Sequence, residues 1–440
     1  MISESIKNVI YIHTHDMGRY ISPYGYELPT PHLDAFSKQA TLFRQAYCCG
    51  PTCSPSRAGL LTGVTPHESG MLGLAHRGFK FEHPEQHLAA YLKGQGFMTA
   101  LCGMQHEFNF AWEQMPYEFV MRENSEQGNA ATDRLWTDAA CDFLRREREQ
   151  PFFLSYGLFY PHREFEAADH SKFPPDSIEL PKCLPDTPEV RRDFADYQYS
   201  VSLADECIGR VLKTIRETGR DRDSLVIVTT DHGIAFPNMK CNLKDEGIGV
   251  TLVMAYPGNP MAGESSDAMV SHLDVYPTIC DLLGLEPPSH LQGESMRPLF
   301  ERTQESIRDE IFSEVTFHAA YEPMRCIRTK RFKLIRRFEV RQRVLANCDD
   351  SPSKQVLIDS GWGAEALPEI ELYDLLEDPQ ETINHATHPE YEYVLRSLSG
   401  KLQDWMVSTS DPLLQGSVQR PERALVNAIT SVSPSEGPYE

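Results

Sequence analysis

The segment from Cys53 to Gly63, which reads C-S-P-S-R-A-G-L-L-T-G, holds the most specific group of reactive side chains in the sequence. The apolar run after Pro55 predicts a helix that begins here, because proline is favoured in the first turn of a helix. Cys53 then lies at the positive N-terminal end of this helix, where an anion is stabilised. Arg57, one turn further, is able to hold an oxyanion by a charge-assisted hydrogen bond. The pattern favours a nucleophile that attacks an anionic group, and a structural cysteine beside a helix start is the alternative.

This segment resembles the C-x-P-S-R-x-x-L-L-T-G signature of the type I sulfatases, a family of the alkaline phosphatase superfamily. The resemblance implies that a maturation enzyme oxidises Cys53 to formylglycine, and that the hydrate of this aldehyde is the nucleophile. It also implies an alkaline-phosphatase-like fold, a divalent metal that is Ca²⁺ in the family, and hydrolysis of sulfate esters or sulfamates.

The resemblance further implies a metal site at the ends of two predicted strands. Family members end the first strand with paired aspartates, whereas this strand ends in His15-Asp16, and a second pair, Asp231-His232, follows the apolar segment SLVIVTT. The expected ligands are these four residues, with the Cys53 side chain nearby. Two imidazoles make the set softer than an all-oxygen calcium site, so that Mn²⁺, iron and Zn²⁺ are alternatives to Ca²⁺. For His15, ordinary structural hydrogen bonding stays an alternative.

Three more residues match family positions that act on the sulfuryl group. His106 ends G-M-Q-H where the family has G-K-x-H, His162 lies in Y-P-H-R, and Lys240 follows the second metal pair. The resemblance implies that Arg57 and Lys240 bind the sulfuryl oxygens and that His162 or Lys240 protonates the leaving group. It implies that His106 then removes a proton so that sulfate is expelled. Met104 stands where the family has a lysine, which removes one cation.

A basic segment runs from Arg325 to Arg343 and holds nine Lys or Arg and one acid, Glu339. One interpretation is a wall of the anion-binding pocket, with His318 and Arg325 facing the substrate. The other is a solvated strand face that pairs with acidic neighbours.

Most of the chain shares the resemblance, and within the family it is nearest to the sulfamidases of N-sulfated glucosamine. The segments that carry it, besides the signature, are 30–35, 66–71, 231–243, 323–325, 371–374 and 378–379. The sequence therefore predicts a sulfatase that hydrolyses the sulfate ester or sulfamate of a small sulfated amino sugar. One alternative is a formylglycine-dependent phosphodiesterase or phosphonate monoester hydrolase, which His15, His232 and Met104 favour. The other is an inactive member that binds sulfated sugars.

The elements that must position these residues alternate between strand and helix over the first two thirds of the chain. Predicted strands cover 8–14, 98–102, 152–158, 224–230 and 250–256, and predicted helices cover 31–42, 85–96, 132–147 and 188–218. This alternation favours an α/β fold with a large, mainly parallel sheet sandwiched by helices, where ligands gather at the carboxyl ends of the strands. We expect a catalytic domain at 1–305, a smaller C-terminal α+β domain at 306–410 and a surface tail at 411–440. The smaller domain has predicted strands at 309–315, 326–337 and 371–375 and a helix at 390–407.

The formal net charge of −22 disfavours nucleic acid and anionic membrane surfaces as partners. A small anion captured by a local positive pocket is compatible with this charge, so the expected partner is a small sulfated substrate. No apolar run approaches the ~18 residues that cross a bilayer, and the N-terminal residues do not have the pattern of a signal peptide. We therefore expect a cytoplasmic protein whose eleven cysteines are free thiols.

Overall fold

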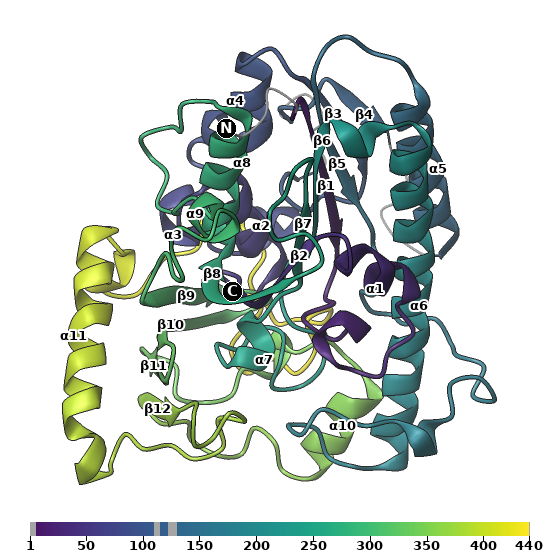
Figure 1. Cartoon of the computed structure of the whole chain (residues 1–440). Helices are drawn as coiled ribbons and strands as arrows, with labels where there is room; N and C mark the ends of the chain where they lie inside the picture. The colour runs from purple at the N-terminus through teal and green to yellow at the C-terminus, as the bar shows by residue number, and fades with distance from the viewer. Residues whose placement is uncertain (1–5, 110–114, 122–129, 440) are drawn as a thin grey trace.

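The structure is a computed structural model that describes residues 6–109, 115–121 and 130–439 (Figure 1). Its larger sheet has eight strands: β1 (Asn8–Thr14), β2 (Thr41–Tyr47), β3 (Met98–Gly103), β4 (Phe119–Met121), β5 (Phe152–Gly157), β6 (Ser224–Thr230), β7 (Leu252–Ala255) and β8 (Ser265–Ser271). Their order is β4-β3-β5-β1-β6-β7-β2-β8. Only β7 runs antiparallel to its neighbours β6 and β2. The sheet is therefore mixed but mainly parallel, which confirms the predicted fold class.

Helices cover both faces of this sheet, because its central strands bury side chains on both sides. In β1, Ile10 and Ile12 pack against α1 (Pro31–Ser37), α5 (Ala130–Arg145) and α6 (Pro188–Glu217). The alternate residues Val9 and Tyr11 pack against α2 (Cys53–Thr62), α4 (Leu88–Gly94) and α8 (Val275–Leu283). Further helices are α3 (Pro66–Ser69), α7 (Asp245–Ile248), α9 (Arg297–Phe300) and α10 (Pro352–Asp359).

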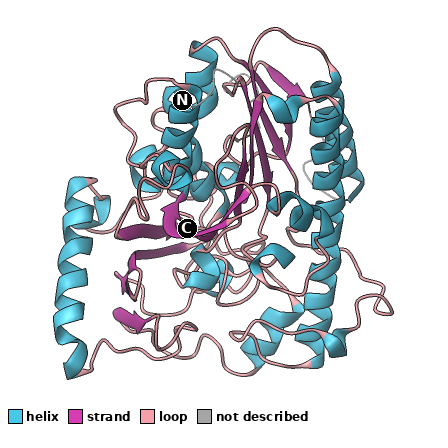
Figure 2. Ribbon diagram, in the orientation of Figure 1, coloured by secondary structure: helices cyan, strands magenta, loops and turns pink. Residues whose placement is uncertain are grey.

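A second, antiparallel sheet has the order β12-β11-β10-β9 and lies beside the first, with β9 next to β8 (Figure 2). Its strands are β9 (Glu310–Phe317), β10 (Tyr321–Thr329), β11 (Phe332–Arg337) and β12 (Ile370–Asp374), and α11 (Glu392–Ser408) packs across it. Val315 and Met324 belong to the same apolar cluster as Val9 and Tyr11, so the two sheets share a core. We keep residue 305 as the proposed domain boundary, since the second sheet lies wholly after it.

Two predicted elements differ from the structure because tertiary partners override local pattern. The helix predicted over 31–42 ends at Ser37, and Thr41 begins strand β2, which is held between β7 and β8. The single strand predicted over 326–337 is part of a hairpin, in which Lys330 and Arg331 lie in the turn between β10 and β11.

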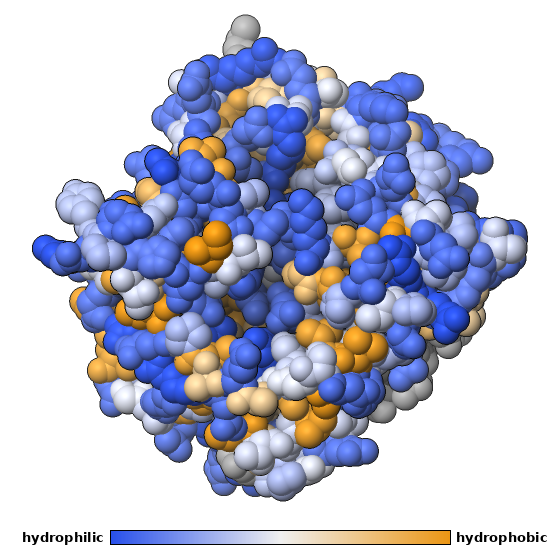
Figure 3. Space-filling model, turned by 90° about the horizontal axis from the view of Figure 1, so that it is seen from below, coloured by the Kyte–Doolittle hydropathy of each residue, from blue (hydrophilic) through white to orange (hydrophobic). Residues whose placement is uncertain are grey.

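The C-terminal segment is ordered against the rest of the fold. Asn427 forms isolated β-bridges with Ala320 and with Tyr439. No helix in the described part of the chain is long and apolar enough to span a membrane. Seen from below, the surface is mostly hydrophilic, and its apolar residues lie in small separate groups (Figure 3).

Candidate active site

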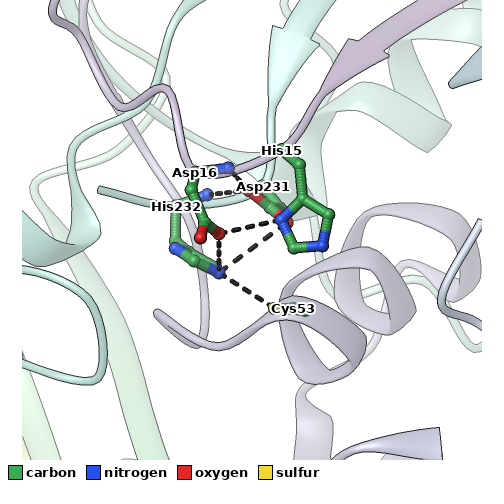
Figure 4. A group of neighbouring side chains, drawn as sticks. All are labelled: His15, Asp16, Cys53, Asp231 and His232. Atoms are coloured by element: carbon green, nitrogen blue, oxygen red, sulfur yellow. Dashed lines mark hydrogen bonds and ion pairs between the residues drawn. The ribbon is translucent and has the colours of Figure 1, made fainter. Parts of the chain in front are cut away.

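Five buried side chains converge where β1 and β6 end and α2 begins: His15, Asp16, Cys53, Asp231 and His232 (Figure 4). One ligand atom from each lies within 4.8 Å of all the others. Strands β1 and β6 are parallel neighbours, so the residues that follow them are brought to the same edge of the sheet. Asp16 has φ 52°, a left-handed conformation that is uncommon for a residue with a side chain and is enriched at functional sites.

Hydrogen bonds orient the two imidazoles toward a common centre. Nδ1–H of His232 donates to the carbonyl of Gly233 at 2.9 Å, so the Nε2 lone pair faces Asp16 Oδ1 at 3.3 Å and Cys53 Sγ at 3.5 Å. Metal-binding histidines usually donate their other ring N–H to such a carbonyl. Nδ1 of His15 lies 2.8 Å from Asp16 Oδ1 and 3.1 Å from an Asp231 oxygen. The donor set therefore fits a divalent ion, and its nitrogens are more typical of Mn²⁺, iron or Zn²⁺ than of Ca²⁺.

Arg57 contacts this cluster through Asp231. Its guanidinium donates to Asp231 Oδ2 at 2.9 Å and to the carbonyl of Thr14 at 3.0 Å, and the side chain is buried. Burial alone would raise the pKa of the Asp231 carboxyl, but the nearby imidazoles and Arg57 hold it well below its usual range. Asp231 is thus a carboxylate. The structure does not bring Arg57 to the pocket surface, where direct contact with the substrate was expected.

A pocket of about 600 Å³ opens onto this cluster. The expected residues that line it are Cys53, His106, His162, Lys240 and His318. The other lining residues were not identified from the sequence, among them His76, Arg77, Asp349 and Tyr439. No motif marks these four. His76 and Arg77 lie in a short 3₁₀ helix (Ala75–Arg77), and Asp349 and Tyr439 lie outside the helices and strands, so only the fold brings them together. Nδ1 of His318 is buried without a hydrogen-bond partner among the described residues, which leaves it available to a ligand.

The two histidines expected to move protons differ in what they present to the pocket. Nδ1 of His106 lies 2.9 Å from Nε2 of His15. Nδ1 of His162 contacts the carbonyl of Arg163, an obligatory acceptor, so Nδ1 carries the proton. Nε2 of His162, which lines the pocket, lies 3.9 Å from Asp16 Oδ2. Burial raises the pKa of the Cys53 thiol well above its usual value, so the unmodified side chain stays protonated.

Lys240 lies between two carboxylates. Its Nζ is 2.9 Å from Asp16 Oδ2 and 3.0 Å from Asp349 Oδ2. Burial alone would lower the pKa of Lys240, but Asp16 and then Asp349 raise it well above its usual value. The side chain is therefore a permanent cation that Asp349 aims into the pocket. Met104, in contrast, is buried in the apolar core and does not line the pocket.

Replacing Asp349 by asparagine is expected to lower kcat/KM for a sulfated substrate by about tenfold to a hundredfold, because the ion pair that positions Lys240 would be lost. The lysine would then be held by Asp16 alone. Asp349→Asn combined with Lys240→Met should cost much less than the sum of the single changes. Asp359→Asn, an exposed position at the end of α10, serves as the control. Additive effects would contradict the coupling.

Arg325 lies away from the pocket, contrary to the expectation that it faces the substrate. Its side chain is fully buried and donates to Asp411 Oδ2 at 2.5 Å and to the carbonyl of Val315 at 2.9 Å, with Glu314 at 3.2 Å. Seven of the nine cations of the basic segment form ion pairs with acidic side chains. None of the nine lines the pocket. Pairing with acidic neighbours is therefore the better interpretation of this segment.

Arg325→Met is expected to destabilise the fold by about 3–5 kcal/mol, because Asp411 and Glu314 would be left buried without their cation. The KM of the folded fraction should be unchanged. Denaturant unfolding and kinetics at low temperature check both statements, with Arg336→Met, whose side chain is 38% exposed, as the matched control. A raised KM at unchanged stability would instead support the interpretation that Arg325 contacts the substrate.

Comparison with known proteins agrees with this geometry. The sequence model of the sulfatase family matches residues 7–285, and that of the C-terminal part of N-sulphoglucosamine sulphohydrolase matches residues 238–355. The chain is 30% identical over 445 residues to human N-sulphoglucosamine sulphohydrolase. The alignment covers 88% of this chain and 86% of the human protein. The chain therefore belongs to the sulfatase family. It is an enzyme of the class that hydrolyses sulfate esters and sulfamates.

Solved structures show the same fold at lower identity. One, determined in complex with its substrate D-glucosamine-2-N,6-O-disulfate, has a TM-score of 0.74 at 21% identity and covers 92% of this chain and 98% of its own. A phosphonate monoester hydrolase of Agrobacterium radiobacter has a TM-score of 0.69 at 19% identity, covering 94% and 100%. These matches show that the chain shares its fold with both of these proteins.

Proposed function

We propose that this protein, once Cys53 is converted to formylglycine by a maturation enzyme, releases sulfate from a small N- or O-sulfated amino sugar. The observation that carries the proposal is the position of Cys53. It begins α2, contacts the metal-ligand cluster through His232, and lines a pocket that also holds the cation of Lys240. The sulfamidase name of the human relative and the sugar bound by the structural neighbour support the substrate class.

We further propose a transition metal, Mn²⁺ or Zn²⁺, in place of the Ca²⁺ of the family. The residues that would hold it are His15, Asp16, Asp231 and His232, with the side chain at position 53. Two nitrogen donors with fixed orientation favour these ions. When bound, the metal would supply positive charge beside the nucleophile and the sulfuryl oxygens.

The roles of the chain's own groups follow from their hydrogen bonds. Lys240 keeps its proton and binds sulfuryl oxygens as a cation. His162 presents Nε2, so in the protonated form it gives a proton to the departing nitrogen or oxygen, and it takes a proton back when sulfate is expelled. His106 has Nδ1 engaged by His15 and is left to orient the substrate with Nε2–H. We therefore assign to His162 the proton removal that the resemblance gave to His106.

The formylglycine would supply what a serine or cysteine lacks. Its hydrate carries two hydroxyls, so that one forms the bond to sulfur and the other drives release of sulfate and return of the aldehyde. This is the chemical reason for placing the modification at the head of a buried helix beside proton-transfer groups.

A second candidate function is phosphodiester or phosphonate monoester hydrolysis. The imidazole ligands and the buried Met104 at the position of the family's lysine favour it. Matured protein should be offered glucosamine N-sulfate, an O-sulfated glucosamine and a phosphodiester in parallel, and released anions quantified by ion chromatography. Sulfate from either sugar supports the proposal. Turnover of the phosphodiester alone would replace it, and binding without turnover of any of the three would indicate an inactive sugar-binding member.

A further inference from the structure

Residues 427–439, named here the C-terminal loop, lie at the mouth of the substrate pocket. Pro434, Ser435 and Tyr439 line the same pocket as Cys53 and Lys240. The pocket therefore extends from the nucleophile to the C-terminal loop.

The loop is closed on itself by hydrogen bonds around Asn427, whose side chain is fully buried. Nδ2 of Asn427 donates to the carbonyls of Ser433 at 3.2 Å and Glu436 at 2.8 Å. The backbone N–H of Ala428 donates to the carbonyl of Pro438 at 2.8 Å. These bonds define one conformation for the segment that reaches the pocket.

Side chains from two other parts of the chain fasten the loop. Arg77, which itself lines the pocket, donates to Asn427 Oδ1 at 2.7 Å and to the carbonyl of Pro434 at 2.5 Å. Lys354, at the start of α10, donates to the carbonyl of Val432 at 2.7 Å. Two buried or half-buried cations therefore hold the backbone of this loop in place, which distinguishes it from a loosely attached surface tail.

Tyr439 is the aromatic residue that this loop contributes. Its hydroxyl donates to the carbonyl of Ser435 at 3.2 Å, which fixes the ring, yet 46% of the residue remains exposed. An exposed, oriented ring in a pocket wall provides an apolar face with a polar edge. The C–H face of a pyranose ring fits such a surface, whereas the anionic sulfuryl group belongs at the cationic inner end with Lys240.

We propose that the C-terminal loop is the outer wall of the substrate pocket and that Tyr439 binds the sugar ring, making it a specificity-determining residue. The inference rests on the proposed function and adds the residue that distinguishes a sulfated sugar from another small sulfated compound. Arg77 and Asn427 act as positioning residues, because they hold the loop that carries Tyr439.

The test compares two substrates that share the reacting group: glucosamine N-sulfate and an acyclic alkyl sulfamate without a ring. Tyr439→Ala is expected to raise KM for the sugar about tenfold, the value of ~1.4 kcal/mol of ring contact, with kcat and the alkyl sulfamate kinetics unchanged. Tyr439→Phe should restore most of the affinity for the sugar. Tyr393→Ala, an 81% exposed tyrosine on α11, is the matched control and should change nothing.

Asn427→Ala provides a second variant, because it should release the loop and raise KM for the sugar in the same direction. Binding of glucosamine N-sulfate by calorimetry gives a readout that does not need turnover. An unchanged KM and affinity in Tyr439→Ala, or equal losses for both substrates, would overturn the inference. Wild-type protein that binds the sugar in a Tyr439-dependent way but releases no sulfate would overturn the proposed function instead.

Discussion

Cys53→Ala is expected to lower kcat for sulfate release by at least about 10⁴-fold, since loss of a nucleophile removes a whole reaction path and leaves only binding and charge stabilisation. The melting temperature should change little. The thiol is 3% exposed and makes only one described polar contact, the 3.5 Å approach of His232. Cys53→Ala removes only the sulfur atom, and because this position lines a pocket, water can fill the space that an apolar core would leave empty.

Cys53→Ser distinguishes the need for formylglycine from the need for any nucleophile at this position. A serine retains one hydroxyl nucleophile but has no second hydroxyl to expel sulfate. We expect at most a single turnover from this variant. Peptide mass spectrometry of wild-type protein should find the aldehyde in place of the thiol at Cys53. Cys183→Ala, outside the pocket, is the control. Steady-state activity above a few per cent of wild type in Cys53→Ala would contradict the role of Cys53 as the source of the nucleophile.

Removal of the metal by a chelator is expected to lower activity by about 10³-fold or more, because the lost charge stabilisation amounts to several kcal/mol. Mn²⁺ or Zn²⁺ should restore it better than Ca²⁺. The reason is the donor set: Nε2 of His232 and Nδ1 of His15 both face the carboxylate oxygens of Asp16 and Asp231. Metal analysis of the purified protein and titration of the apoprotein with each ion check this result.

The double variant His15→Asp, His232→Asn makes the ligand set all-oxygen and should move the preference toward Ca²⁺. His290→Asn is a suitable control, because His290 lies outside the ligand cluster. Calcium as the native metal, with the same preference in the double variant, would contradict the assignment of imidazole ligands and leave His15 as a structural residue bonded to Asp16.

The catalytic half of the fold follows the local pattern closely. Strands β1, β5 and β6 and helix α6 lie within a few residues of their predicted bounds. Each is a buried apolar run or a long amphipathic segment, in which the local signal and the tertiary environment agree. Strands β2 and β8 were not predicted. β8 begins with the polar residues Ser265 and Ser266, and it pairs with β2 along its length.

What the sequence alone determined is the candidate reactive centre: Cys53 at a helix start, and the pairs His15-Asp16 and Asp231-His232 at strand ends. Parallel neighbouring strands bring their carboxyl ends to one edge of a sheet, so a local motif after each strand is enough to place these groups together.

Only the tertiary structure decided the rest of the pocket. Asp349 and Tyr439 reach Lys240 and the pocket mouth from loops far along the chain, and Arg325 is turned inward to Asp411. Long-range packing decides which residues lie next to a charged or aromatic side chain. A charge that is buried without a partner costs free energy, and any acidic or basic side chain that the fold brings near can pair with it. Sequence spacing carries no information about which partner that is.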